Sequence, residues 1–232
     1  MSGPRYAIYY APAADSPLWR FGIATLGFDA YTGAELPFSV PPGCDAASWP
    51  QRTAEPRRYG FHATLKAPFE LANGPSEGQL RAFAHRRAAG LTAVPLAGLA
   101  VTALGRFIAL TPAEPNGPLQ TLAFDIVQAF EPFRAPLSPA DRERRLATPL
   151  TPAERACLEA YGYPYVGDAF RFHMTLTGSL PPEELGGVKA ALAQAYVKSV
   201  PPGPVAIDRI ALFRQDDREG RFRILDSFRL GG

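Results

Sequence analysis

The chain has 232 residues, long enough for one large domain or two small lobes with a buried core. Its composition, 47% hydrophobic and 20% charged, is ordinary for a globular protein that folds in water. The formal net charge of +2 is too small for nucleic acid or a membrane to be bound through bulk charge. Any anion must therefore be bound by locally placed groups.

The sequence predicts a cytoplasmic protein. Cys44 and Cys157 form no spacing motif and are expected to be reduced thiols. The first residues, MSGPRYAIYYAPAADSP, contain no basic segment followed by a long apolar run, so no signal peptide is predicted. No segment approaches the ~20 apolar residues of a membrane span. No required protein partner is evident.

In the first half of the chain, residues 5–12 are rich in aromatic residues and predict a strand. Asp15 or Ser16 can cap a helix that begins at Pro17. Residues 30–58 are rich in turn formers and are interpreted as mostly loop. The spacing over 75–91 predicts a helix, whose His85 lies among exposed residues and is not expected to take part in chemistry.

In the second half, the predicted strands and helices are separated by clear turn signals. Residues 94–104 and 106–112 predict strands that turn at Gly105, and residues 203–215 and 220–230 predict two more. Helices are predicted at 118–133, at 151–162 with a capping box from Thr151 to Glu154, and at 181–197 with an interruption at Gly186–Gly187. The charge run that follows Ser138 indicates a solvated loop or a short exposed helix.

A short segment occurs twice: FHATLKAPF at 61–69 and FHMTLTGSL at 172–180. Both copies read Phe-His-x-Thr-Leu, and they contain two of the chain's three histidines. A single histidine on a strand is more often structural than catalytic. Two matching copies in a histidine-poor chain indicate function, so they are the predicted centre of the site.

Each copy is predicted to form a strand with one polar face, because side chains alternate faces in an extended chain. The polar faces predicted in this way are His62, Thr64 and Lys66 in the first copy, and Arg171, His173, Thr175 and Thr177 in the second. Four residues after the histidine stands Lys66 in one copy and Thr177 in the other. This difference indicates a substrate with distinguishable ends.

Two imidazoles at one phosphate suit in-line attack at phosphorus. One takes a proton from the attacking oxygen while the other gives a proton to the leaving oxygen, and a pKa near ~6.5 allows either role. The Thr hydroxyls can donate to the non-bridging oxygens, and Lys66 and Arg171 would add positive charge. Two histidines without a cluster of carboxylates or thiolates are a poor ligand set for zinc or magnesium, so no metal and no other cofactor is predicted.

The two halves of the chain follow the same order of elements. Each motif is followed by a helix, a strand, a turn and a strand. The next strand begins 32 residues after His62, and about as far after His173, where Val205 is 32 residues on. A pseudo-twofold axis is the economical explanation. It predicts that the two motif strands face each other across a groove.

The segments RRYGFHATLKAPF and YGYPYVGDAFRFHMTLTG resemble the two-histidine (2H) phosphoesterase superfamily, and more closely a bacterial branch associated with phosphonate metabolism. The resemblance implies an α+β fold: a single bilobal domain over 1–232, with an antiparallel sheet and flanking helices in each lobe. The motif strands, near 59–69 and 170–179, would line a V-shaped central groove. It also implies metal-independent hydrolysis of phosphate esters or cyclic phosphodiesters, with His62, Thr64, His173 and Thr175 as catalytic residues.

Three functions stay open from the sequence. The first is hydrolysis of a cyclic phosphodiester or phosphate ester of a small sugar phosphate or nucleotide, such as a phosphoribosyl 1,2-cyclic phosphate. The second is RNA end processing, as a 2′,3′-cyclic phosphodiesterase or a 2′,5′-ligase-like protein. The third is binding of a phosphate ligand without turnover. A basic rim would favour RNA; its candidate residues are Arg52, Arg57, Arg58 and Arg171, with Tyr59 or Tyr165 for stacking.

The sequence does not assign acid and base between the two histidines, the product or the oligomeric state. Lys66, Arg171, Thr177, Tyr59 and Tyr165 are the predicted substrate-binding residues. Tyr163 and Tyr165 either line the groove or pack beside Pro164.

Overall fold

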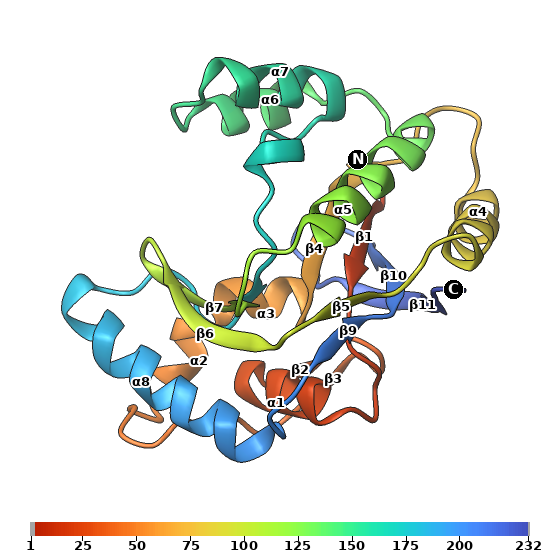
Figure 1. Ribbon diagram of the computed structural model, residues 1–232. Coiled ribbons are helices and arrows are strands. Elements are labelled where there is room, and N and C mark those ends of the chain that lie inside the picture. The colour runs from red at the N-terminus through yellow and green to blue at the C-terminus, as the bar shows by residue number, and fades with distance from the viewer. Residues whose placement is uncertain (1–2, 232) are drawn as a thin grey trace.

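The fold is described from a computed structural model, which places residues 3–231 (Figure 1). The strands are β1 Arg5–Tyr10, β2 Phe28–Asp29, β3 Ala34–Glu35, β4 Ala63–Glu70, β5 Val94–Leu96, β6 Leu99–Leu104, β7 Phe107–Pro112, β8 Met174–Thr175, β9 Val205–Ile207, β10 Arg209–Gln215 and β11 Arg223–Arg229. The α-helices are α1 Pro17–Leu26, α2 Trp49–Arg52, α3 Ala54–Tyr59, α4 Glu77–Ala89, α5 Gly117–Ala129, α6 Pro139–Leu146, α7 Pro152–Tyr161 and α8 Pro182–Ser199. Short 3-10 helices lie at Glu131–Phe133 and Gly167–Ala169.

The main sheet has seven strands in the order β11-β10-β1-β4-β8-β7-β6, and neighbouring strands are antiparallel. In this sheet, the strands that follow each motif lie on the side of the other motif. Strands β6 and β7, which follow the first motif, lie on the side of the second motif strand β8, and β7 pairs with it. Strands β10 and β11, which follow the second motif, lie on the side of the first motif strand β4 and are separated from it by β1. The predicted α+β class, with antiparallel strands and flanking helices, is confirmed.

The two predicted sheets are joined into one at a narrow seam. Strands β4 and β8 pair there only through Ala63 and Met174. The motif strands therefore lie side by side in one sheet. The prediction that they face each other across a groove is corrected. Pairing satisfies backbone groups that two open sheet edges would leave without partners. That residues 1–232 form a single bilobal domain stays a prediction, and residues 1–2 and 232 lie outside the described part of the chain.

The predicted turns and helix ends are confirmed where local chemistry determines them. Ser16 caps α1, because its Oγ accepts a hydrogen bond from the Trp19 N–H at 3.1 Å. Thr151 and Glu154 form the predicted capping box of α7. Gly105, with φ of 60°, supplies the left-handed turn between β6 and β7.

The interpretation of 30–58 as mostly loop is wrong at its end, where α2 and α3 form. Pro50 and Pro56 indicate turns in the sequence, but both lie in the first turn of a short helix. The missing N–H of proline costs little there, because the first N–H groups of a helix have no intrahelical partner. The charge run after Ser138 forms the helix α6, and α8 continues through Gly186 and Gly187 without the predicted interruption.

The helices cover the sheet unequally. Helix α5 packs on β4, α4 packs on β10 and β11, and α8 packs on β6, β7 and α1. Helices α6 and α7 stand away from the sheet at the top of Figure 1. Between residues 3 and 231, no helix has both the length and the apolar content needed to cross a bilayer.

Candidate active site

The first motif begins at a sharp turn that orients its histidine. Gly60 has φ of 75°, and a Cβ there would come within 2.8 Å of the Ala30 methyl group, so glycine fits this turn best. The Gly60 carbonyl accepts a hydrogen bond from Nδ1 of His62 at 2.9 Å. This bond places the proton of a neutral imidazole on Nδ1 and makes Nε2 an acceptor, to which the Thr64 hydroxyl donates at 3.3 Å.

The second motif repeats this arrangement. Nδ1 of His173 donates a hydrogen bond to the Arg171 carbonyl at 2.7 Å, again two residues before the histidine. Both imidazoles thus have the same tautomer when neutral, with Nε2 as the unprotonated nitrogen that can accept a proton. Both rings are partly buried, so they are held in place and still accessible.

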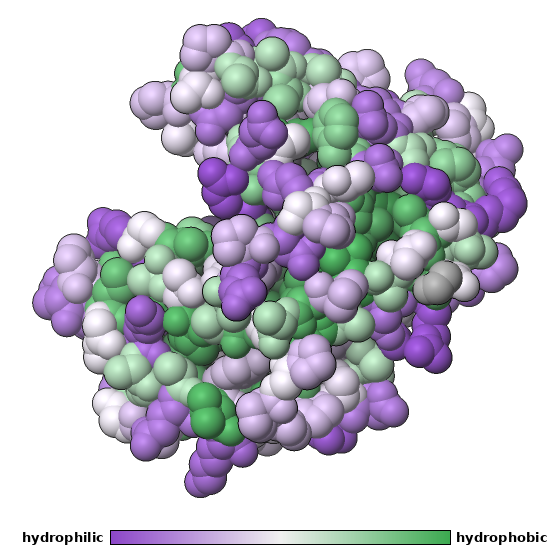
Figure 2. Space-filling view, viewed as in Figure 1, coloured by the Kyte–Doolittle hydropathy of each residue, from purple (hydrophilic) through white to green (hydrophobic). Residues whose placement is uncertain are grey.

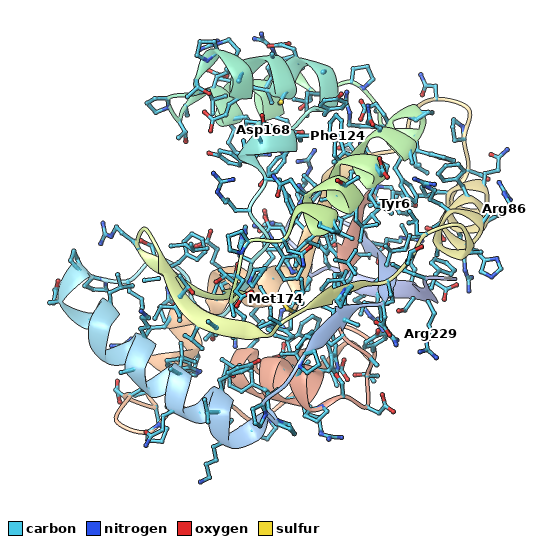
Figure 3. All side chains as sticks on the ribbon, in the orientation of Figure 1. Tyr6, Arg86, Phe124, Asp168, Met174 and Arg229 are labelled. Atoms are coloured by element: carbon cyan, nitrogen blue, oxygen red, sulfur yellow. The ribbon has the colours of Figure 1, made fainter. Side chains whose placement is uncertain are left out.

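The register of the seam brings the two motifs together. Ala63 pairs with Met174, which is fully buried at the centre of the molecule (Figure 3). Continuing this antiparallel register by one residue in each direction sets His62 opposite Thr175, and Thr64 opposite His173. Side chains alternate faces, so these four polar side chains share the face opposite to Ala63 and Met174. Directly opposed side chains have Cβ atoms about 4.5–5.5 Å apart, which is close enough to surround one phosphate.

All four polar side chains line one cleft, with a volume of about 490 Å³. Tyr163 also lines this cleft, which answers the question left open by the sequence for that residue. In Figure 2 the molecule is hollowed between helices α6 and α7 and the β6–β7 hairpin. A cleft of this size can enclose a small ligand.

Tyr9 is a site residue that the sequence analysis missed. Its ring stacks on the His62 imidazole, with centroids 3.9 Å apart and an interplanar angle of 24°. Burial lowers the pKa of His62 to about 4, the hydrogen bond to the Gly60 carbonyl opposes this shift, and the nearby His173 adds to it. No pattern in the sequence marks Tyr9, because its contact depends on β1 lying beside β4.

This environment predicts a pH-dependent stability. The unfolded chain binds a proton at His62 near pH 6.5, whereas the folded chain binds it only near pH 4. We therefore expect the free energy of unfolding to fall as the pH is lowered from 6.5 to 4, by on the order of 2–3 kcal/mol from this residue. Denaturant unfolding of the wild type and of His62→Gln at pH 7 and pH 4.5 measures the effect. Equal pH dependence of the two proteins would contradict it.

Lys66 does not lie in the cleft, which corrects the sequence prediction. Tyr9 pairs with Thr64 and Ile8 pairs with Lys66, so β4 has a bulge at Leu65. The extra residue reverses the alternation, and Lys66 points to the face opposite to Thr64. Its buried ammonium group donates to the Val127 carbonyl at 3.1 Å and to Glu131 at 2.7 Å, and burial lowers its pKa.

The ion pair between Lys66 and Glu131 is expected to matter for stability and not for chemistry. Glu131→Ala should lower the free energy of unfolding by about 2 kcal/mol, because it leaves a buried ammonium without its carboxylate. Lys66→Met should stay within about 1 kcal/mol of wild type and keep its activity toward phosphate esters. Denaturant unfolding and turnover of both variants test this. A loss of turnover in Lys66→Met as large as in a histidine variant would show that Lys66 acts in the site.

The other predicted binding residues divide between two neighbouring pockets. Thr177 and Tyr59 line the cleft: the Thr177 hydroxyl accepts the Ile108 N–H at 3.0 Å, and the Tyr59 ring stacks on Phe222. Tyr165 and Arg171 line an apolar pocket of about 240 Å³ beside His173. The Arg171 guanidinium donates to the carbonyls of Asp168 and Phe170, at 2.8 and 2.9 Å. The binding roles of these residues stay predictions.

The basic side chains of the cleft are not the predicted ones. Arg5, Arg144 and Arg145 line it, whereas Arg52, Arg57, Arg58 and Arg171 do not. Arg52 forms an ion pair with Glu184 at 2.9 Å. Arg5 belongs to the first strand, and the other two lie in the charge run interpreted as solvated surface. No local pattern indicates that α6 borders the site.

Residues 64–223 match the family described as "Protein of unknown function (DUF1045)". The chain belongs to this family. A curated relative from Janthinobacterium sp. (strain Marseille), named ribose 1,5-bisphosphate phosphokinase PhnN, is 35% identical over 218 residues. That alignment covers 91% of this chain and 48% of the relative. The chain thus spans about half the length of the curated relatives it matches.

Solved structures with a similar fold include E. coli LigT complexed with 3′-AMP. It is 14% identical, with a TM-score of 0.43 and full coverage of both chains. The protein TT0787 of Thermus thermophilus is 16% identical, with a TM-score of 0.45 and 98% coverage of both chains.

Proposed function

We propose that this chain is a phosphoesterase that hydrolyses a cyclic phosphodiester of a small phosphorylated molecule by acid–base catalysis with two histidines. The observation that carries the proposal is the pairing of β4 with β8, which sets both His-x-Thr pairs on one face of the sheet within one cleft. Each histidine has the same tautomer, fixed by a backbone carbonyl, and directs Nε2 away from that carbonyl.

The environment of His62 favours one of the two roles. His62 has a lowered pKa and is neutral at neutral pH, so its Nε2 suits the general base. In the proposed step a water oxygen forms a bond to phosphorus as the bond to the ester oxygen on the far side breaks. Nε2 of His62 takes the proton of the water, and the imidazolium of His173 protonates the leaving oxygen. In a cyclic diester that oxygen stays on the product, which is a phosphate monoester.

Thr64 and Thr175 would stabilise the charge that develops during this step. Their hydroxyls lie on the same face as the imidazoles and can donate to the non-bridging phosphate oxygens. Each hydroxyl is set opposite the histidine of the other strand by the seam register. One phosphate would thereby contact both halves of the chain, which is why neither motif alone makes a site.

The substrate we favour is a cyclic phosphate of ribose or of a related sugar phosphate, in phosphonate metabolism. The support is the name of the curated relatives, which refers to a ribose bisphosphate, together with the phosphonate-associated sequence resemblance. Because the chain matches only about half of those relatives, their kinase activity is not carried over to it.

The experiment that tests this function is turnover after treatment with EDTA. The substrates are phosphoribosyl 1,2-cyclic phosphate, 2′,3′-cyclic nucleotides and a 2′,5′-linked oligonucleotide. We expect release of a monoester from a cyclic substrate at an unchanged rate after EDTA. Loss of turnover on chelation would contradict a mechanism without metal. If none of the substrates is turned over but the protein still binds phosphate, the result would favour a binding protein without catalytic activity.

A second candidate is hydrolysis of 2′,3′-cyclic phosphates at nucleotide or RNA ends. The observation in its favour is the apolar pocket beside His173, whose aromatic side chains include Phe107, Phe124 and Tyr165. Such side chains stack on bases. The four arginines predicted as a basic rim do not line the cleft, so a long RNA strand finds less support than a single nucleotide.

A further inference from the structure

The cleft contains a guanidinium group that forms no ion pair with any residue from 3 to 231. Arg145 of α6 has no hydrogen-bond or ion-pair partner among residues 3–231, and its Nε is inaccessible to solvent. Its guanidinium carbon lies 5.0 Å from the centre of the Tyr163 ring. Burial lowers the pKa of Arg145. A partly buried cation with an unsatisfied donor is costly unless an anion compensates it.

Arg5 is in a similar position on the neighbouring wall. Its guanidinium donates to the amide oxygen of Gln215, a neutral acceptor, at 2.8 Å from Nε. Burial and the nearby Arg218 lower the pKa of Arg5. The sheet thus holds a second cation beside the cleft with no carboxylate bound to it.

The neighbouring carboxylates, Asp141 and Glu70, already form ion pairs with other arginines. Arg218 holds Asp141 at 2.9 Å and Glu70 at 2.7 Å, and Asp141 also pairs with Arg144. Among the described residues that line the cleft, Glu55 is the one carboxylate against three arginines. Arg5, Arg144 and Arg145 also line a polar pocket that continues from the cleft beneath α6. These three arginines give the cleft an excess of positive charge, and none of them lines the apolar pocket beside His173.

We propose that Arg145 and Arg5 form a second anion subsite that binds a phosphate group of the substrate other than the one that is cleaved. The inference rests on the proposed function and narrows the substrate to a molecule with two phosphate groups, one at the histidines and one at the arginines. Arg binds phosphate through two parallel N–H donors, which the two terminal nitrogens of the Arg145 guanidinium can supply. Helix α6 is then the element that selects the substrate.

The subsite is tested first with inorganic phosphate, followed by NMR at the side-chain Nε–H signals of arginine and the ring signals of histidine. We expect the Arg145 signal, assigned with Arg145→Lys, to shift as phosphate is added, and to do so also in His62→Ala/His173→Ala. An Arg145 signal that stays fixed while the histidine signals move would overturn the subsite and leave the proposed function standing. If the histidine signals stay fixed while the Arg145 signal moves, the proposed function is overturned and the subsite stands.

Calorimetry tests whether one molecule places a phosphate group at the histidines and another at the arginines. The matched pair of ligands is adenosine 3′-phosphate and adenosine 3′,5′-bisphosphate. We expect the bisphosphate to bind roughly 10-fold or more tightly, as one charge-assisted arginine–phosphate contact provides. Arg145→Met should remove this preference. The control Arg155→Met, an exposed α7 residue outside the cleft, should keep it. Equal binding of the two nucleotides to the wild type would overturn the proposal.

Discussion

His62→Ala and His173→Ala are each expected to lower kcat toward a cyclic phosphodiester by about 10²–10⁴-fold, the range for removal of a general acid or base. The two losses should not add in His62→Ala/His173→Ala, because both residues act in one step. Steady-state turnover of the single and double variants, at one pH and with matched circular dichroism spectra, measures this.

The matched control is His85→Ala. His85 lies exposed on α4 and lines neither pocket at the seam, so its removal should leave kcat unchanged. A full additive loss in the double variant would mean that the two histidines act in separate steps. Unchanged turnover in either single variant would remove that histidine from the mechanism.

Gly22→Ala is expected to give the largest loss of stability, at least about 3 kcal/mol. Gly22 lies on the buried face of α1, and a Cβ there would overlap the ring of Phe61, which is fully buried. Overpacking a dense core costs about 1–3 kcal/mol and more when nothing can move. Phe61 precedes His62 directly, so a shifted ring would also displace the His62 imidazole. Chemical denaturation of wild type and variant tests the size of the loss.

Two further variants separate the clash from the cost of changing a helical glycine. Gly186→Ala replaces an exposed glycine of α8 with no neighbouring atom within 4 Å, and should raise stability by about 0.5–1 kcal/mol. Adding Phe61→Leu to Gly22→Ala should recover part of the lost stability, because the smaller side chain makes room. If the double variant Gly22→Ala/Phe61→Leu is less stable than Gly22→Ala alone, the steric explanation is contradicted.

Much of the fold follows from local signals in the sequence. The caps at Ser16 and Thr151 and the turn at Gly105 act through neighbouring residues alone, so their helices and strands were predicted correctly. The repeated motif predicts His62 and His173 as site residues, because a duplicated polar pair on an apolar strand has no structural need. The structure places both motifs in one cleft, as a shared site requires.

The rest of the fold and of the candidate site depends on which strands become neighbours in the sheet. No local sequence pattern determines this. The crossover that pairs β8 with β4 sets the motif strands side by side, where the sequence predicts that they face each other across a groove. The pairing of β1 with β4 brings Tyr9 onto His62. The bulge at Leu65 reverses the face of Lys66, and a single extra residue of this kind leaves no mark in the alternation of polar and apolar residues. Arg145 was assigned to solvent because its charge run gives no sign of the cleft beside it.

The most direct test of the central claim is an NMR titration of the histidine ring signals with inorganic phosphate. The chain has only three histidines, so each signal can be assigned with one alanine variant. If the two motifs form one site, the His62 and His173 signals shift together with a single apparent Kd, and the His85 signal stays fixed. Shifts of the two signals with separate Kd values, or a shift of only one of them, would contradict a shared phosphate site.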